Sequence, residues 1–286
     1  MSSEISTSFK QSYHDMLEIG LQQQGSRLRP AVRVESVNAK YGYFDRVNSV
    51  SAVEKTSRHA PTPQIDTPHV RRRVDMRDFH FADMIDKQDV IRATANPESA
   101  YVQNAIYSLG REMDNQVISA AFGTAYEGET GGTSTTFPTA TQQIAHGSAG
   151  MTVAKLRAAK KILDSNEVGD EPRFIACTAQ QIDDLLGTTQ VTSTDYNSVK
   201  ALVQGEVNTF LGFTFIRTEL IDISGSTRSC IAWSRSGLLL GVGIDIETDI
   251  SVRNDMSNAI QVYARATFGA TRMYEEKVVE IQCTES

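Results

Sequence analysis

The sequence of 286 residues lacks several features that define large classes of protein. No run approaches the roughly 18 consecutive apolar residues that a membrane-spanning helix needs. The polar N-terminus, MSSEISTSFKQ, does not combine a basic end with an apolar stretch, as an export signal would. We therefore expect a protein that is neither exported nor inserted in a membrane.

Cysteine is also scarce, and acidic residues outnumber basic ones. The three cysteines, Cys177, Cys230 and Cys283, are far apart and have no metal-ligand spacing, which predicts buried free thiols in a reducing cytosol. A net charge of -7 disfavours a dedicated nucleic-acid binder, whose affinity depends on neutralising phosphates. This charge is still compatible with a shell that encloses nucleic acid.

Motifs for catalysis and cofactor binding are missing as well. There is no phosphate-binding Gly-Lys-Ser/Thr loop, and Gly241–Asp245 (GVGID) lacks the third glycine of a dinucleotide-binding turn. The histidines are scattered without ligand spacing, and no serine lies in a nucleophile elbow. Adjacent Asp183 and Asp184 would point about 100° apart on a helix, so they do not converge as an acid pair. We predict no catalytic, cofactor or metal site, and an unassigned cytosolic enzyme is the alternative that the sequence least favours.

The sequence does contain enough apolar residues, 40%, for a sizeable core in about two domains or one large one. In residues 198–219 a helix over Val199–Val207 is predicted to lead through a turn at Gly212 into a buried strand at Phe213–Ile216. The rest of the second half predicts a helix capped by Thr152, a strand at Arg173–Thr178, a short helix at Ala179–Leu186, and strands at Ser229–Trp233, Leu238–Val242, Ile244–Val252 and along Ala259–Gln282.

One long helix stands out in the first half. Asn96 is a capping residue, Pro97 fits the first helical position, and Glu98 is an acid in the first turn. Apolar residues then recur at near-helical spacing until Gly123, which predicts a helix over 97–122 of roughly 39 Å. The next segment, 124–150, is rich in glycine, threonine and serine and predicts an extended surface insertion or a weak hairpin.

The N-terminal third predicts two thin appendages. Residues 1–34 form an arm whose apolar stripe, from Phe9 to Leu21, would lie on another surface, its own or a partner's. Residues 35–83 predict a ribbon of two alternating strands, Val32–Val47 and Val70–Phe81, joined by a tip with three prolines. A two-stranded ribbon with so few apolar residues lacks a core, so we expect it to be stable only when it lies on something else.

The same ribbon carries the strongest local cluster of charges. On one strand Arg71, Arg73 and Asp75 would share a face with Arg77, whereas Arg72 would point to the other face. A nucleic-acid patch and a solvated edge are alternatives, but the interleaved acids favour ion pairs with a neighbouring subunit. The predicted subunit-interface residues are Lys55, Arg58, Arg71, Arg72, Arg73, Asp75, Arg77 and Asp78.

This order of elements resembles that of the tailed-bacteriophage major capsid proteins of the Hong Kong 97-like fold. The order includes FLGFTFI at 210–216 in the mixed α/β region, and six phrases look like one subfamily: GSRLRP at 25–30, TSRH at 56–59, RRR at 71–73, DYN at 195–197, KALVQGE at 200–206 and GATRM at 269–273. The resemblance implies an α+β fold with an N-terminal arm at 1–34, an extended loop at 35–83, a peripheral domain at 84–169 and 246–286 with a spine helix at 97–122, and an axial domain at 170–245.

The resemblance also implies a function. Such a protein self-assembles as pentamers and hexamers into an icosahedral shell that encloses the double-stranded DNA of a tailed bacteriophage, without sequence-specific binding. Its expected partners are copies of itself, a portal protein and a separate scaffolding or decoration protein, with no membrane and no cofactor. Its expected location is the virion capsid, after assembly in the bacterial host cytoplasm. The alternative within shells is an encapsulin-like compartment that encloses a protein cargo.

Overall fold

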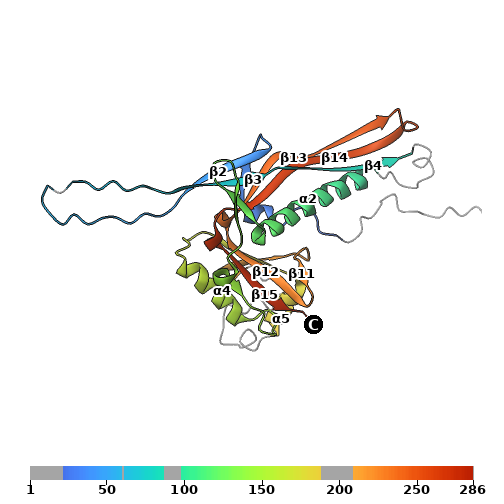
Figure 1. Ribbon diagram of the computed structural model, residues 1–286. Helices are drawn as coiled ribbons and strands as arrows, with labels where there is room; N and C mark the ends of the chain where they lie inside the picture. The colour runs from blue at the N-terminus through green and yellow to red at the C-terminus, as the bar shows by residue number, and fades with distance from the viewer. Residues whose placement is uncertain (1–21, 60, 87–97, 188–208, 286) are drawn as a thin grey trace, which may run out of the picture.

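The computed structural model describes residues 22–59, 61–86, 98–187 and 209–285, which contain three β-sheets. Figure 1 shows a body of two layers, with α2 between the sheet that holds β13 and β14 and the sheet that holds β12 and β15. A long, thin loop projects from one side of this body (Figure 1). The chain thus combines a packed body with an appendage.

The first layer is a four-stranded sheet, in the order β1-β13-β14-β4, that packs on α2 (Glu98–Phe122). Residues four apart share one side of a helix, so Leu109 and Met113 both enter the core with Phe268 of β14. The long helix predicted over 97–122 is confirmed from Glu98 to Phe122, and its predicted capping residues Asn96 and Pro97 lie outside the described residues. The strands are β1 (Arg33–Ser36), β4 (Arg77–Ile85), β13 (Leu238–Arg253) and β14 (Ala259–Arg272), and a short 3-10 turn, η2 (Arg29–Ala31), precedes β1.

The second layer is a seven-stranded sheet, in the order β7-β15-β12-β8-β10-β9, with β11 paired to β12. Its core joins Leu156 and Leu163 of α4 to Ile175 of β8. The predicted cap of α4 is confirmed, because the Thr152 hydroxyl accepts the Lys155 N–H at 3.3 Å. The elements are α3 (Thr139–Gln142), β7 (Gln143–Ile144), α4 (Val153–Ser165), β8 (Arg173–Cys177), α5 (Ala179–Leu186), β9 (Thr209–Phe210), β10 (Phe213–Arg217), β11 (Ile223–Ser224), β12 (Thr227–Ser234), η4 (Arg235–Gly237), η5 (Glu275–Lys277) and β15 (Val278–Thr284).

The predicted glycine turn into a buried strand is confirmed between β9 and β10. Gly212 has a φ of 85° and Leu211 a φ of 53°, so two successive residues take the left-handed conformation that reverses the chain. Phe213, directly after the turn, is fully buried. The helix predicted at Val199–Val207 lies outside the described residues.

The loop has two limbs, residues 33–47 and 69–85, and each limb passes from one sheet into another. The two continuous strands predicted for these limbs are therefore wrong. The first limb breaks between β1 and β2 (Tyr41–Val47), and the second breaks at Met76, between β3 (His69–Asp75) and β4. The second limb crosses β14 at Gly269, where a Cβ would lie 2.0 Å from the carbonyl oxygen of Asp75. The alternation of apolar and polar residues does not reveal such a break, because a strand in either sheet alternates between a buried and an exposed face.

A third, small sheet supports the base of the loop, in the order β2-β3-β5-β6. The hairpin of β5 (Ala125–Glu127) and β6 (Thr133–Thr135) comes from the segment predicted as an insertion or weak hairpin, and β5 pairs with β3. For β2 and β3 the support on which the ribbon was expected to lie is therefore this hairpin of its own chain. Between Val47 and His69 the described residues form no strand.

The C-terminal strands also differ from the prediction. The two strands predicted at Leu238–Val242 and Ile244–Val252 are one strand, β13, with register shifts on either side of Ile244. The run Ala259–Gln282 splits at η5, where the chain leaves the first layer for the second. The segments 84–169 and 246–286, predicted as one peripheral domain, contribute to both layers, since α4 and β15 pack in the second.

Candidate functional site: the root of the extended loop

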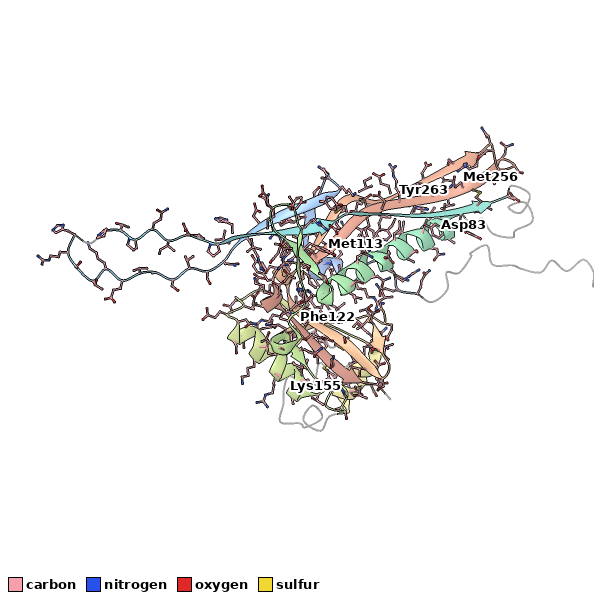
Figure 2. The ribbon with its side chains drawn as sticks, in the orientation of Figure 1. Asp83, Met113, Phe122, Lys155, Met256 and Tyr263 are labelled. Carbon is pink, nitrogen blue, oxygen red and sulfur yellow. The ribbon has the colours of Figure 1, made fainter. Side chains whose placement is uncertain are left out.

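The loop root, made of β2, β3, β5, β6 and residues 272–275, is where the three sheets meet. In Figure 2 side chains crowd together at this junction, whereas those along the projecting limbs point into open space. The root therefore determines the direction in which the loop leaves the body.

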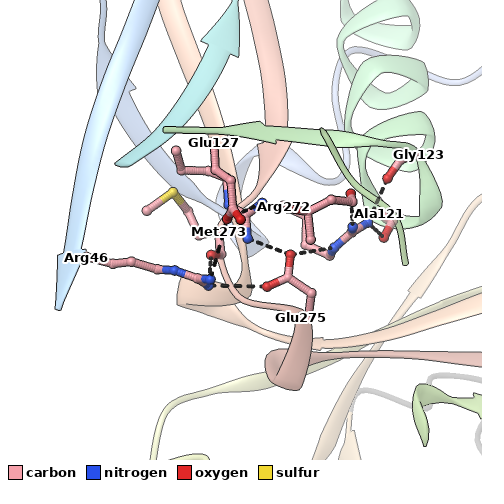
Figure 3. A network of polar contacts seen from close by, with 9 residues as sticks. Arg46, Ala121, Gly123, Glu127, Arg272, Met273 and Glu275 are labelled. Atoms are coloured by element: carbon pink, nitrogen blue, oxygen red, sulfur yellow. Dashed lines mark hydrogen bonds and ion pairs between the residues drawn. The ribbon is translucent and has the colours of Figure 1, made fainter. Parts of the chain in front are cut away.

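An arginine cluster lies at the centre of the root. The buried Arg72 guanidinium donates to the Glu275 carboxylate at 2.5 Å and lies 3.5 Å from that of Glu127. Arg46 donates to the same Glu275 carboxylate at 3.2 Å, and Arg272 lies 3.5 Å from it, so Glu275 is shared by three arginines (Figure 3). These three cations and two carboxylates are largely shielded from water. Removing any one of them would therefore leave a buried charge without its full set of partners, which is costly. The arginine cluster consists of Arg46, Arg72, Arg272, Glu127 and Glu275.

Two of these arginines also bind backbone carbonyls. Arg272 donates to the carbonyl oxygens of Ala121 and Gly123, each at 2.9 Å, and so caps the C-terminal end of α2 (Figure 3). Burial lowers the pKa of Arg272, and the Glu275 carboxylate opposes that effect. Arg46 donates to the Met273 carbonyl oxygen at 2.8 Å. The cluster therefore joins the first limb of the loop to the helix and to the end of β14.

The neighbours of Arg72 point to the opposite, exposed face of the small sheet, as their alternation predicted. Arg71 pairs with Asp45 at 2.6 Å, and hydrogen bonding to Arg71 holds the pKa of Asp45 below its usual value. Arg73 pairs with Asp75 at 2.7 Å, and hydrogen bonding to Asp75 raises the pKa of Arg73. All three consecutive arginines thus have carboxylate partners within their own chain.

The other predicted interface residues lie in two further places. Lys55 and Arg58 are exposed at the tip of the loop, and neither has an ion pair within the described part of the chain. Arg77 and Asp78 lie on β4, in the first layer, where Asp78 accepts the Thr267 hydroxyl at 2.6 Å. The structure therefore separates these eight residues into the root, the tip and the start of β4.

Sequence reasoning missed the partners of Arg72. Glu275 is 203 residues from Arg72, and no local pattern marks Glu275, Glu127 or Arg46 as members of one cluster. Arg272 lies within the GATRM phrase at 269–273, which carried the resemblance but gave no structural role. The sequence therefore marked Arg272 only through a resemblance to a family, and not through a local physical pattern.

The described residues offer little for chemistry. No group of three or more histidine, cysteine or acidic residues among them is placed to hold a metal ion, and none of their helices is long and apolar enough to cross a membrane. Cys177, Cys230 and Cys283 are buried free thiols on neighbouring strands, as predicted. Burial raises the pKa of Cys177 to about 12, which makes it a poor nucleophile. The role that the geometry of the root supports is structural, because it provides a fixed base for the projecting loop.

Comparison with known families gives one match over nearly the whole chain. The family model described as "Phage capsid protein" matches residues 5–285. No match was found among curated protein sequences.

Solved structures with the same arrangement come from several phages. The capsid of cyanophage P-SCSP1u superposes with a TM-score of 0.75 at 14% identity, covering 100% of this chain and 96% of that one. The capsid of Ralstonia phage GP4 gives 0.75 at 9% identity, covering 98% and 96%. A chain from Mycobacterium phage Che8 gives 0.73 at 14% identity, covering 96% and 97%. At such identities the likeness is one of fold, and it confirms the predicted Hong Kong 97-like α+β architecture.

Proposed function

The chain belongs to the phage capsid protein family, and from this premise we propose that it is the major capsid protein of an icosahedral shell. The observation that carries the proposal is the family match over residues 5–285, joined to a body from which a long loop projects whose described tip residues form no strand. A structural family of this kind implies a protein that acts by assembling and not by catalysing a reaction.

Assembly in this proposal proceeds through repeated contacts between unlike surfaces of neighbouring copies. Such heterologous contacts close into rings, here pentamers and hexamers, when the rotation between copies permits. We assign contacts between copies to the exposed charges Lys55, Arg58, Arg71, Arg77 and Asp78. Arg72, Arg73 and Asp75 support the same contacts from within, because their ion pairs hold the loop at its root.

The remaining parts of the proposal concern placement and partners. Residues 1–34 act as an arm, 35–83 as the extended loop, the layer with α2 as the periphery of each ring, and the layer with α4 and α5 as its axial part. The shell encloses double-stranded DNA in the virion after assembly in the bacterial cytoplasm, with a portal protein and a scaffolding or decoration protein as partners. The net charge of -7 supports enclosure without tight binding of DNA.

Purified protein tests the proposal directly. Size-exclusion chromatography and negative-stain microscopy should show large closed particles of uniform size. A discrete oligomer of a few copies under all assembly conditions would count against a shell. Particles from infected cells that contain packaged protein and no double-stranded DNA would indicate a cargo compartment in place of a phage capsid.

A further inference from the structure

The arginine cluster at the loop root contains more positive than negative charge. Arg46, Arg72 and Arg272 contribute three cations, whereas Glu127 and Glu275 contribute two carboxylates. Within the described part of the chain, the ion pairs of these three arginines involve only those two carboxylates. The cluster therefore has a formal charge of +1, the difference between three cations and two anions.

Burial makes this excess of positive charge costly. The side chains of Arg72 and Arg272 are completely buried. Those of Arg46 and Glu275 expose only 11% of their surface. Burial lowers the pKa of Arg272, the Glu275 carboxylate opposes that effect, and the charge of Arg72 lowers the pKa further. A buried charge has lost its hydration, and only a partner of opposite sign can replace that loss.

The cluster also contains N–H donors that lack acceptors. The Nε atoms of Arg46, Arg72 and Arg272, together with Nη1 of Arg72, are buried and have no hydrogen-bond partner among the described residues. Nη1 of Arg72 lies 3.5 Å from the Glu127 carboxylate, and Nε of Arg272 lies 3.5 Å from that of Glu275. Both distances exceed those of an ordinary N–H···O hydrogen bond. Buried donors without acceptors are destabilising, so the cluster lacks acceptors as well as negative charge.

The C-terminal end of α2 supplies only part of what the cluster lacks. The end of a helix is equivalent to roughly half a negative charge, and Arg272 donates to the carbonyl oxygens of Ala121 and Gly123 at this end. These two hydrogen bonds use Nη1 of Arg272 and none of the unpaired donors. The helix therefore reduces the excess of positive charge, but it leaves those donors without acceptors.

A small monovalent anion would supply both the charge and the acceptor. Guanidinium groups are weakly hydrated, and several of their N–H groups can donate to one anion. A water molecule could accept the same hydrogen bonds, but it would leave the charge unbalanced. A divalent anion such as sulfate would reverse the sign of the charge of the cluster. Chloride carries the single negative charge that the cluster lacks.

We propose that the arginine cluster binds one chloride ion through the unpaired N–H groups of Arg46, Arg72 and Arg272. Arg46 lies on the first limb of the loop, Arg72 on the second limb, and Arg272 at the end of β14. Arg46 and Arg272 reach the cluster from opposite sides (Figure 3). The bound ion therefore joins both limbs of the loop to the body. This site lies within one chain, so the inference goes beyond the proposed function and does not depend on it.

The melting temperature of unassembled subunits in two sodium salts tests the proposal. Sodium chloride and sodium gluconate are compared at equal ionic strength, so that the screening of charges is the same and only the size of the anion differs. We expect the melting temperature to be about 2–4 °C higher in chloride, because an ion that binds only the folded chain stabilises it. Equal melting temperatures in the two salts overturn the proposal.

Two variants change the charge of the cluster in opposite directions. Arg46→Met removes one cation and its donors, so the difference between the two salts should disappear. Glu127→Gln removes one carboxylate and keeps a side chain of nearly the same shape. The chloride concentration for half-saturation, measured from the line width of the chloride NMR signal, should then fall by about tenfold or more. Each variant is compared with itself in the two salts, so a change in its own stability does not affect the result.

Arg71→Met is the control for the loss of an arginine from the same sheet. Arg71 is adjacent to Arg72 on β3, but it pairs with Asp45 on the exposed side. This variant should keep the difference between the two salts that the wild type shows. A chloride effect that survives Arg46→Met, that disappears in Arg71→Met, or that Glu127→Gln weakens overturns the proposal.

Discussion

The root and the tip of the loop are parts of the same two limbs, but they differ in the contacts that they make within the chain. At the root β2 and β3 pair over seven residues each, and Arg72 and Val74 are fully buried. At the tip Val50, Val53 and Ile65 are exposed, and the described residues form no strand. Intramolecular contacts thus fix the root, and the tip is left free for contacts with other molecules. The effect of a substitution should therefore depend on its distance from the root.

The largest effect is expected from Arg72→Ala. This change leaves Glu275 buried beside fewer cations, and breaking a buried ion pair typically costs about 3–5 kcal/mol. We expect a loss of that size in the free energy of unfolding of unassembled subunits, measured with denaturant and circular dichroism.

Arg71→Ala is the matched control, because it removes the adjacent arginine from an exposed ion pair with Asp45. Exposed pairs of this kind contribute little to stability because solvent screens them, so this variant should unfold almost as the wild type does. Equal losses from the two variants would contradict the division between a buried and an exposed side of β3.

A smaller effect is expected where the second limb crosses β14. In Gly269→Ala the new Cβ would lie 2.0 Å from the Asp75 carbonyl oxygen, so the crossing must open. We expect a loss of roughly 1–3 kcal/mol in unfolding free energy, typical of overpacking. Gly169→Ala, where nothing lies within 4 Å of the added Cβ, should stay within about 0.5 kcal/mol of the wild type. If both variants are neutral, the limb does not depend on close approach to β14.

Acid should weaken the body more than the loop, and Glu171 provides the test. Burial raises the pKa of Glu171, but hydrogen bonds from Ser236, Ser234 and Lys277 outweigh it and hold the pKa at about 2. A lowered folded-state pKa gives stability that is present above the ordinary value of 4.5 and is lost as the pH falls toward 2. Solvent screening limits this contribution to about 1 kcal/mol.

Glu171→Gln should therefore remove part of the acid dependence of the melting temperature between pH 4.5 and 2. Asp45→Asn at the exposed side of the root should alter that dependence much less, although hydrogen bonding to Arg71 also lowers the pKa of Asp45. The opposite ranking would mean that the loop, and not the body, limits stability in acid.

Sequence reasoning succeeded where the determinants of structure are local. Helix α2 and the turn at Gly212 follow from residue spacing and glycine placement within short windows. It failed where the determinant is distant: the break at Met76 depends on Gly269, and the environment of Arg72 depends on Glu275. Alternation correctly separated Arg72 from its neighbours, but it could not show that the side away from solvent was a buried cluster. The alternation within a run of charged residues shows which side chains share a face, but it does not identify the residues with which they pair.

The smallest effect on stability, and the sharpest test of the comparison, is expected at the tip. Lys55 and Arg58 are exposed and have no ion pair in the described part of the chain, so reversing both to glutamate should change the unfolding free energy by less than about 0.5 kcal/mol. If they pair with carboxylates of a neighbour, the reversal places like charges together at every repeated contact. We expect the subunit concentration for half-assembly to rise roughly tenfold, or ~1.4 kcal/mol per contact, as measured by light scattering. The charge-conserving pair Lys55→Arg and Arg58→Lys should assemble normally. A reversal that destabilises the subunit and leaves assembly unchanged would place the tip, like the root, among the parts that hold one chain together.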